Sequence, residues 1–208
     1  MLSPESDPRA PARTMDCARG CFRSVVTDLE MTAPPEFGSL SPPAPGVTVQ
    51  PWADPPVDEY LTLFRQVGDP WLWYGRLRAS RTDIVDLLQH PGHEVWRLWH
   101  GPSVAGLCEL DRRLPGETEI AYFGLVPNFI GRGLGGYFLR TMLAEAWRGE
   151  VRRVWLHTCT EDHPDALTVY QRIGFRPYQS REEWVRDPRL DGLLPRHAGP
   201  HVKIPEAP

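Results

Sequence analysis

The stretch Ile130-Gly131-Arg132-Gly133-Leu134-Gly135-Gly136 decides how this chain folds and what it binds. It follows an apolar, strand-like run and opens directly into an amphipathic helix. Glycine has no Cβ, so backbone N–H groups in such a turn can approach an anion closely. The helix behind the turn adds the positive end of its dipole. The sequence therefore predicts a turn that binds the pyrophosphate of a cofactor.

Glycine-rich turns of three kinds bind phosphates, and the flanking residues separate them. A Walker loop needs Lys followed by Ser or Thr after the last glycine, but Gly136 is followed by Tyr137 and Phe138. A dinucleotide fold has an acidic residue at the end of the next strand, and here that strand ends in His-Thr-Cys at 157–159. A nicotinamide-dependent oxidoreductase remains an alternative that cofactor binding would test. An acyl-coenzyme A site is the third interpretation.

Two motifs resemble the GNAT superfamily of N-acetyltransferases. The pattern Gln or Arg, two residues, Gly, any residue, then Gly or Ala falls on Ile130, Gly133 and Gly135, with Ile130 in place of the usual first residue. The stretch His163–Phe175 is similar to the family's later helix, in which a Tyr precedes a Gly-Phe step. The resemblance covers roughly residues 47–185. It implies transfer of an acetyl group from acetyl-CoA to a primary amine of an unidentified acceptor, without a metal.

The spacing of apolar residues predicts helices and strands that agree with this resemblance. Helices are expected at 57–67, at 82–89 after a Ser80 or Thr82 cap, at 134–147 and after Pro164. Strands are expected at 95–99, 104–111, 117–126 and 154–158, with a final strand pair in 175–185. The expected class is α/β, with a GNAT-like mixed, mostly antiparallel central sheet of about six to seven strands flanked by about four helices.

The amino-acid composition suggests how the chain is divided into a domain and flanking segments, and in which compartment the protein acts. Most of the 23 prolines lie toward the two ends, so we expect a proline-rich N-terminal extension (1–45), an acetyltransferase domain (46–186) and a proline-rich C-terminal tail (187–208). A net charge of -4 argues against nucleic acid as a partner. Neither a signal peptide nor a membrane span is expected, which favours the cytoplasm. The apolar residues of the tail suggest a possible homodimer.

Attack of an amine on a thioester needs a base and benefits from an acid. The resemblance assigns Glu119 as general base and Tyr170, near the thioester sulfur, as general acid. If the hairpin turns about 114–116, Asp111 lies opposite Glu119, and the two carboxylates then share one site and raise one apparent pKa. The alternatives are a rim carboxylate paired with an arginine for Glu119 and a core tyrosine for Tyr170.

The resemblance also implies the contacts with acetyl-CoA. Backbone groups of Leu125 and Val126 would pair with the pantetheine arm. His163 stands where many relatives have Asn and would lie near the pantetheine amide, or would instead cap the helix that follows. The pyrophosphate would be held by Gly131, Arg132, Gly133, Leu134, Gly135 and Gly136.

The acceptor site is less well defined by the sequence. Trp71, Trp73 and Tyr74 would form a wall for a ring, an acyl chain or a cationic amine, or would cover the sheet as core residues. The acidic residues at 109, 111 and 119 favour a cationic amine as the acceptor. A protein that binds acyl-coenzyme A without transferring the acyl group, as a sensor or interaction module, is the alternative function.

Overall fold

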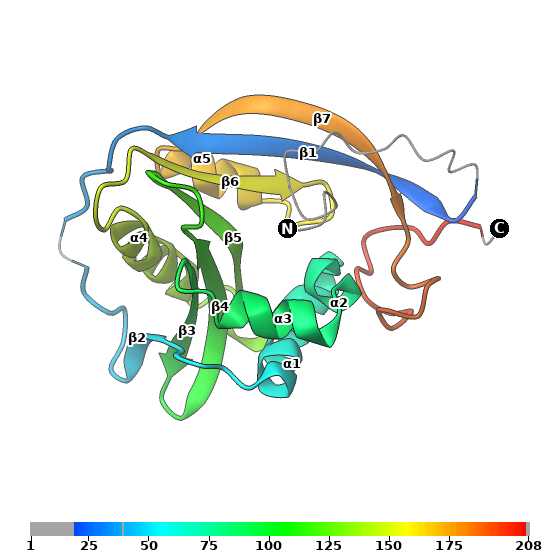
Figure 1. Ribbon diagram of the computed structural model, residues 1–208, viewed down its shortest axis with the longest axis horizontal. Coiled ribbons are helices and arrows are strands. Elements are labelled where there is room, and N and C mark those ends of the chain that lie inside the picture. Colours follow the sequence, from blue (N-terminus) through cyan, green and yellow to red (C-terminus); the bar gives the residue numbers. More distant parts are fainter. Residues whose placement is uncertain (1–18, 39, 207–208) are drawn as a thin grey trace.

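The computed structural model describes residues 19–38 and 40–206 (Figure 1). Seven strands form one sheet in the order β2-β3-β4-β5-β6-β1-β7. The strands are β1 (Cys21–Met31), β2 (Val47–Pro51), β3 (His93–His100), β4 (Ser103–Asp111), β5 (Glu117–Leu125), β6 (Arg153–Cys159) and β7 (Arg176–Arg186). The helices are α1 (Val57–Gly68), α2 (Gly75–Arg78), α3 (Arg81–Leu88), α4 (Leu134–Ala146) and α5 (Ala166–Arg172), with short 3-10 turns η2 (Asp69–Trp71) and η3 (Pro127–Phe129).

The predicted fold class is confirmed. Every pair of neighbouring strands is antiparallel except β5 and β6, which are parallel. The predicted helices and strands lie within a few residues of the observed ones, and Ser80 caps α3 through a reciprocal bond with Asp83. The final strand pair expected in 175–185 is wrong, since this segment is the single strand β7. Among the described residues, no helix combines the length and the apolar character needed to cross a membrane.

Two apolar layers cover the sheet. The buried face of α4, which includes Leu139, Met142 and Leu143, packs in one cluster with sheet residues such as Leu98 and Leu156. The helices α1 and α3 belong to a second cluster on the other face. Its members are Tyr60, Leu63, Phe64, Val67, Ile84, Leu88, Val95 and Leu107. The sheet therefore separates a layer that carries the glycine-rich turn from a layer that carries the aromatic residues after α1.

The strand β1 lies inside the sheet, so the expectation that residues 1–45 form an extension is corrected for this stretch. It pairs with β6 on one side and with β7 on the other. No proline lies between Pro11 and Pro34, and the run Val25-Val26-Thr27 is typical of a strand. The proline content of the whole segment concealed this local pattern. Residues 1–18 of the expected extension lie outside the described residues.

The C-terminal segment is packed rather than loose, although its prolines suggested a tail. Leu194 and Ala198 are buried in a third apolar cluster with Phe22 of β1. Arg189 is also buried and pairs with Asp187 at 2.7 Å. Its guanidinium donates hydrogen bonds to the carbonyls of Ala198, Gly199 and Val202. These bonds close residues 187–202 on themselves, and the apolar cluster with Phe22 holds the segment against the domain.

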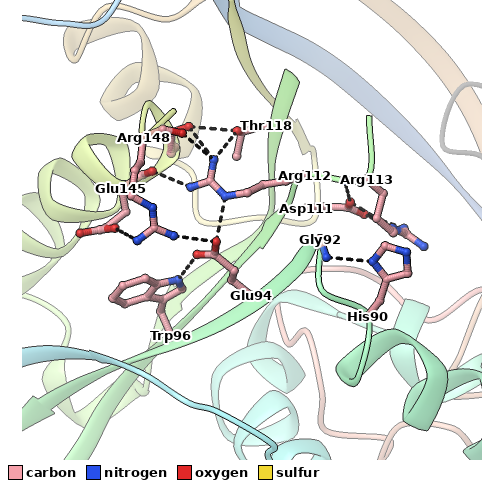
Figure 2. A network of polar contacts seen from close by, with 11 residues as sticks. His90, Gly92, Glu94, Trp96, Asp111, Arg112, Arg113, Thr118, Glu145 and Arg148 are labelled. Atoms are coloured by element: carbon pink, nitrogen blue, oxygen red, sulfur yellow. Dashed lines mark hydrogen bonds and ion pairs between the residues drawn. The ribbon is translucent and has the colours of Figure 1, made fainter. Parts of the chain in front are cut away.

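A partly buried arginine in the β4–β5 turn joins α4 to the sheet. Figure 2 shows Arg112 between Glu94 and the end of α4. Its Nε donates to Glu94 at 2.9 Å, and its Nη groups donate to the carbonyls of Glu145 (2.6 Å) and Ala146 (3.2 Å). The last carbonyls of a helix have no partner within the helix. Arg112 therefore caps α4 and fixes the end opposite to its glycine-rich start.

Replacing this arginine should destabilise the protein more than replacing its exposed neighbour. We expect Arg112→Ala to lower the free energy of unfolding by about 2–3 kcal/mol, because it removes several charge-assisted hydrogen bonds that join the end of α4 to Glu94 of β3. Arg148 also binds Glu94, but its side chain is 58% exposed against 16% for Arg112. Arg148→Ala should therefore cost less than about 1 kcal/mol. Urea unfolding measures both, and equal losses would contradict the capping role.

A candidate active site between two diverging strands

The strands β5 and β6 pair over only three residue pairs, from Glu117↔Arg153 to Glu119↔Trp155. Beyond these pairs the two strands separate (Figure 1). A cavity of about 490 Å³ lies in this region. Residues 120–125 of β5 line one side, and His157 and Cys159 of β6 line the other. The early end of the parallel pairing thus opens a cavity of a size that suits a small-molecule ligand.

A β-bulge in β5 sets the direction of the side chains near the cavity. Glu109 pairs with Tyr122 and the next residue of β4 pairs with Ile120, so Ala121 is the extra residue. The bulge reverses the alternation, and Phe123 packs against Phe138 in the α4 layer at 5.1 Å between ring centroids. Sequence analysis on simple alternation would place Phe123 on the same face as Glu119. The bulge makes that expectation wrong.

At the end of β5, the backbone N–H and C=O of one residue are not bonded to β4 and face the cavity. The N–H of Val126 donates to the carbonyl of Ala105 at 2.9 Å, so it is committed to β4. Because hydrogen-bonded positions alternate along an antiparallel pair, the N–H and C=O of Leu125 point away from β4, toward the side where β6 has separated. Leu125 lines the cavity and Val126 does not.

The glycine-rich turn is open and follows the cavity wall. Gly131 (φ 77°) and Gly133 (φ 75°) have left-handed backbone conformations, and a Cβ at either would meet no atom within 4 Å. Gly133 begins α4 without a side-chain cap, and the first turn of the helix has no acidic residue. The Leu134 side chain is buried, whereas Arg132 is exposed and lies 5.4 Å from the Phe129 ring. Of the glycines in this turn, Gly131, Gly135 and Gly136 line the cavity.

Glu119 lies in the last residue pair that joins β5 to β6, and its pKa is far above the ordinary value. Burial, followed by the charge of Asp111, raises its pKa to about 8. Asp111 lies directly opposite Glu119 in β4, as the hairpin register predicts. Asp111 itself is held by Arg113, and despite partial burial these bonds lower its pKa. Of the two carboxylates, Glu119 is the one that stays protonated near neutral pH.

Glu109 is a structural carboxylate. It is fully buried and accepts hydrogen bonds from Tyr60 (2.7 Å) and Arg76 (2.8 Å), with the His93 Nε2 at 3.3 Å. Burial acts to raise its pKa, but Arg76 and His93 outweigh burial and lower it to about 2. With Glu109 and Asp111 both paired, these carboxylates lend little support to a cationic acceptor at this end of the cavity.

His157 lies between the cavity and Glu119, a role that the sequence analysis did not assign. Its Nδ1 is 3.8 Å from the Glu119 Oε1, and it lines the cavity while Glu119 does not. Burial lowers its pKa, so the imidazole is neutral at pH 7. His157 is two residues beyond Trp155, the partner of Glu119, and therefore lies on the same face of the sheet. That alternation is the signal that could have identified it.

The helix α5 brings Tyr170 and the preceding loop to the cavity. Tyr170 lines the cavity and also packs on Phe175, at 6.0 Å between ring centroids. Burial raises its pKa, which keeps the hydroxyl protonated. His163 lines the cavity too, and its Nδ1 accepts the N–H of Asp165 at 3.2 Å. Asp165 is the N-cap residue of α5 and the helix has no side-chain cap, so the capping alternative for His163 is wrong. The helix begins at Ala166, later than the sequence analysis expected.

The three aromatic residues after α1 form the wall that was expected. Trp71, Trp73 and Tyr74 all line the cavity. Trp73 is also a packing residue, since its ring lies 5.5 Å from Phe64 and its Nε1 donates to Asp162 at 3.4 Å. Trp73 therefore both lines the cavity and packs in the core. Among the described residues, no group of three or more His, Cys, Asp or Glu side chains could hold a metal ion.

The raised pKa of Glu119 makes a prediction about stability. Its native pKa of about 8 exceeds the ordinary value of 4.5, so the native state holds the proton more tightly. Stability contributed by this group is present below pH 4.5 and is lost as pH rises toward 8. Glu119→Gln should therefore gain stability relative to the wild type by up to about 1.4 kcal/mol per pH unit over this interval. Urea unfolding at pH 5, 6.5 and 8 measures the difference, and a constant difference would contradict the raised pKa.

Comparisons with known proteins agree with this geometry. Residues 52–175 match the acetyltransferase (GNAT) family model. The N-alpha-acetyltransferase RimI of Mycobacterium tuberculosis is 38% identical over 92 residues, which cover 44% of this chain and 56% of RimI. The mycothiol acetyltransferase of Acidothermus cellulolyticus is 31% identical over 105 residues, which cover 50% of this chain and 28% of that protein. The chain therefore spans about half or less of the length of these two relatives.

Solved structures share the fold. A functionally unknown protein from Staphylococcus epidermidis matches with a TM-score of 0.59 at 16% identity, over 81% of this chain and 63% of that chain. A GNAT-family protein from Novosphingobium aromaticivorans, described as a putative acetyltransferase, matches with a TM-score of 0.53 at 17% identity, over 78% of this chain and 65% of that chain. At these identities they support the fold alone. With a family match that covers more than half of its residues, the chain belongs to the GNAT family of acetyltransferases.

Proposed function

We propose that this chain transfers an acetyl group from acetyl-CoA to a primary amine by direct attack of the amine on the thioester. The observation that carries the proposal is the composition of the cavity wall. One cavity joins the open edge of Leu125, the glycines at 131, 135 and 136, and the protonated hydroxyl of Tyr170. Family membership and the printed name of RimI, an N-alpha-acetyltransferase, support an amine acceptor.

The residues present fit acetyl-CoA. The uncapped start of α4 offers the N–H groups of residues 134–136 to a pyrophosphate, and Arg132 adds a positive charge beside them. Gly133 permits the left-handed turn that opens this end of the helix. The backbone of Leu125 pairs with the pantetheine arm, while the N–H of Val126 remains with β4. At the other end, His163 and Tyr170 lie on the thioester side.

The same residues account for the chemistry. Glu119 in its ionised form accepts the proton that the amine loses, and the neutral His157 lies between them to pass it on. The amine nitrogen then bonds to the carbonyl carbon, and the C–S bond breaks. The sulfur leaves as a thiolate, and Tyr170, whose raised pKa keeps its hydroxyl protonated, stabilises it by donating a hydrogen bond.

The first test is calorimetric titration with acetyl-CoA and with NADH, followed by thiol release on a panel of primary amines. We expect acetyl-CoA to bind and NADH not to bind, with thiol released on at least one amine. Binding without release on any amine would favour the sensor alternative. Failure to bind acetyl-CoA would refute the proposal.

A glycine pair tests the phosphate contact. Ala at Gly133 must adopt a left-handed conformation that costs about 1–2 kcal/mol, and this strain falls on the turn that binds the phosphates. We expect Gly133→Ala to weaken acetyl-CoA binding roughly tenfold. Gly149 is also left-handed and equally open, but it follows α4 at the far end. Gly149→Ala should leave binding unchanged, and equal effects of the two variants would contradict the assignment.

The pH dependence tests the catalytic residues. After correction for the unprotonated fraction of the amine, kcat/KM should rise with pH and level off above about 8, where Glu119 is ionised. Glu119→Gln should lower kcat roughly 100-fold and remove this rise. Tyr170→Phe should lower kcat with little change in KM while the thermal stability is retained. A wild-type profile that is unaltered in Glu119→Gln would exclude this carboxylate as the base.

A further inference from the structure

The cavity has a second region that the proposed chemistry does not use. It is lined by side chains of β1, of the segment after β6 and of β7. The charged and polar members include Ser24, Glu161, Arg181 and Glu183. Three of these four residues lie outside the family match at 52–175, so the family says nothing about them. The inference below rests on the proposed function and concerns the acceptor.

Glu161 is a buried carboxylate whose partners are all neutral. Its residue is 6% exposed, and its carboxylate accepts hydrogen bonds from the Ser24 Oγ (2.6 Å) and the Thr160 Oγ1 (2.8 Å). Among the described residues, no cationic side chain forms an ion pair with it, whereas the equally buried Glu109 has Arg76. A buried carboxylate is costly unless a positive charge compensates it. Among the described residues, Glu161 therefore lines the cavity as a carboxyl group without a cationic partner, and a positively charged group of a ligand would supply that partner.

The nearby arginines are already engaged. Arg181 lines the cavity, but its guanidinium donates to Asp28 and, at 2.7 Å, to Glu183. Arg78 lies over the Tyr74 ring and donates to the carbonyl of Arg186. Counting Asp28, Glu161 and Glu183 against Arg181 leaves two negative charges in excess around this region.

The electrostatic environment of the Tyr74 side chain indicates that Glu161 and Glu183 face the same part of the cavity. Its pKa is raised mainly by burial, and the charges of Glu183 and Glu161 raise it further. Tyr74 also lines the cavity. The carboxylates from β7 and from the end of β6 therefore converge on the aromatic wall, and the field that they create there favours a cation.

We infer that Glu161 forms a subsite for a second, positively charged group of the acceptor. The acceptor class is then a diamine, or another primary amine that carries an additional cation. The charged group donates to the Glu161 carboxylate while the other amine, unprotonated, attacks the thioester. The negative region also repels the phosphates of coenzyme A, which bind at the start of α4 beside Arg132. The two ends of the cavity thereby select ligands of opposite charge.

Calorimetry with matched amines tests the subsite. The protein is saturated with coenzyme A, which cannot donate an acetyl group, and titrated with 1,3-diaminopropane through 1,6-diaminohexane. Each diamine has a control of the same carbon number with one amine, such as 1-aminopentane for 1,5-diaminopentane. We expect the best diamine to bind at least about tenfold more tightly than its control, because its second ammonium forms a desolvated, charge-assisted hydrogen bond.

Variants assign the effect to one residue. Glu161→Gln keeps an acceptor for Ser24 but removes the charge, and it should bring the diamine to the affinity of its control. Glu182 is a neighbouring acid of β7 that is exposed and paired with Arg23, so Glu182→Gln should change nothing. Thermal denaturation checks that each variant is folded. If Glu161→Gln does not fold, the wild-type comparison of diamine with monoamine still decides.

The outcomes separate this inference from the proposed function. If no diamine binds more tightly than its control, or if Glu161→Gln retains the preference, the subsite is refuted even where acetyl transfer to amines is observed. If diamines bind with the expected preference and no thiol is released from acetyl-CoA, the subsite stands and the transferase proposal fails.

Discussion

The rest of this structure depends on the point at which β5 and β6 stop pairing. Backbone N–H and C=O groups inside a protein need partners, and a sheet normally supplies them along its whole length. Here the parallel register ends at Glu119↔Trp155, and Leu125 keeps a free edge. A proline, Pro127, follows closely and cannot donate to a ladder. The sheet thus remains whole at one end and offers a strand edge to a ligand at the other.

Three carboxylates on two adjacent strands show how neighbours determine a role. Glu109 is fully paired with Arg76, Tyr60 and His93 and serves the packing of α1 and α2 on the sheet. Asp111 is paired with Arg113. Glu119 forms no ion pair with an arginine among the described residues, and burial together with the charge of Asp111 outweighs the charges of Arg76 and Arg113, so its pKa is raised. Residue type alone does not distinguish the three, because the difference lies in which cations the fold brings to them.

Much of the fold could be predicted from local patterns. The spacing of apolar residues located α1, α3 and α4, and the short turn at 114–116 was enough to place Asp111 opposite Glu119. The bulge at Ala121 could not be foreseen, since an extra residue leaves no mark on a sequence read as simple alternation. The strand β1 was missed because its partners, β6 and β7, lie more than a hundred residues away in the chain. Pairing at that distance is a tertiary effect that no local window contains.

The difference between local patterns and contacts of distant segments also explains why the motifs indicate the cofactor and not the acceptor. The glycine-rich turn and the helix with Tyr170 are continuous segments inside the family match. The acceptor side is assembled from distant parts: His201 contacts the carbonyl of Glu161 at 2.8 Å, and Trp71 lies beside both His163 and His201. A wall built by β1, β7 and the C-terminal segment can change without disturbing the cofactor site. The proposed acceptor side therefore combines residues inside the family match, such as Trp71 and Glu161, with the strands β1 and β7, which lie outside it.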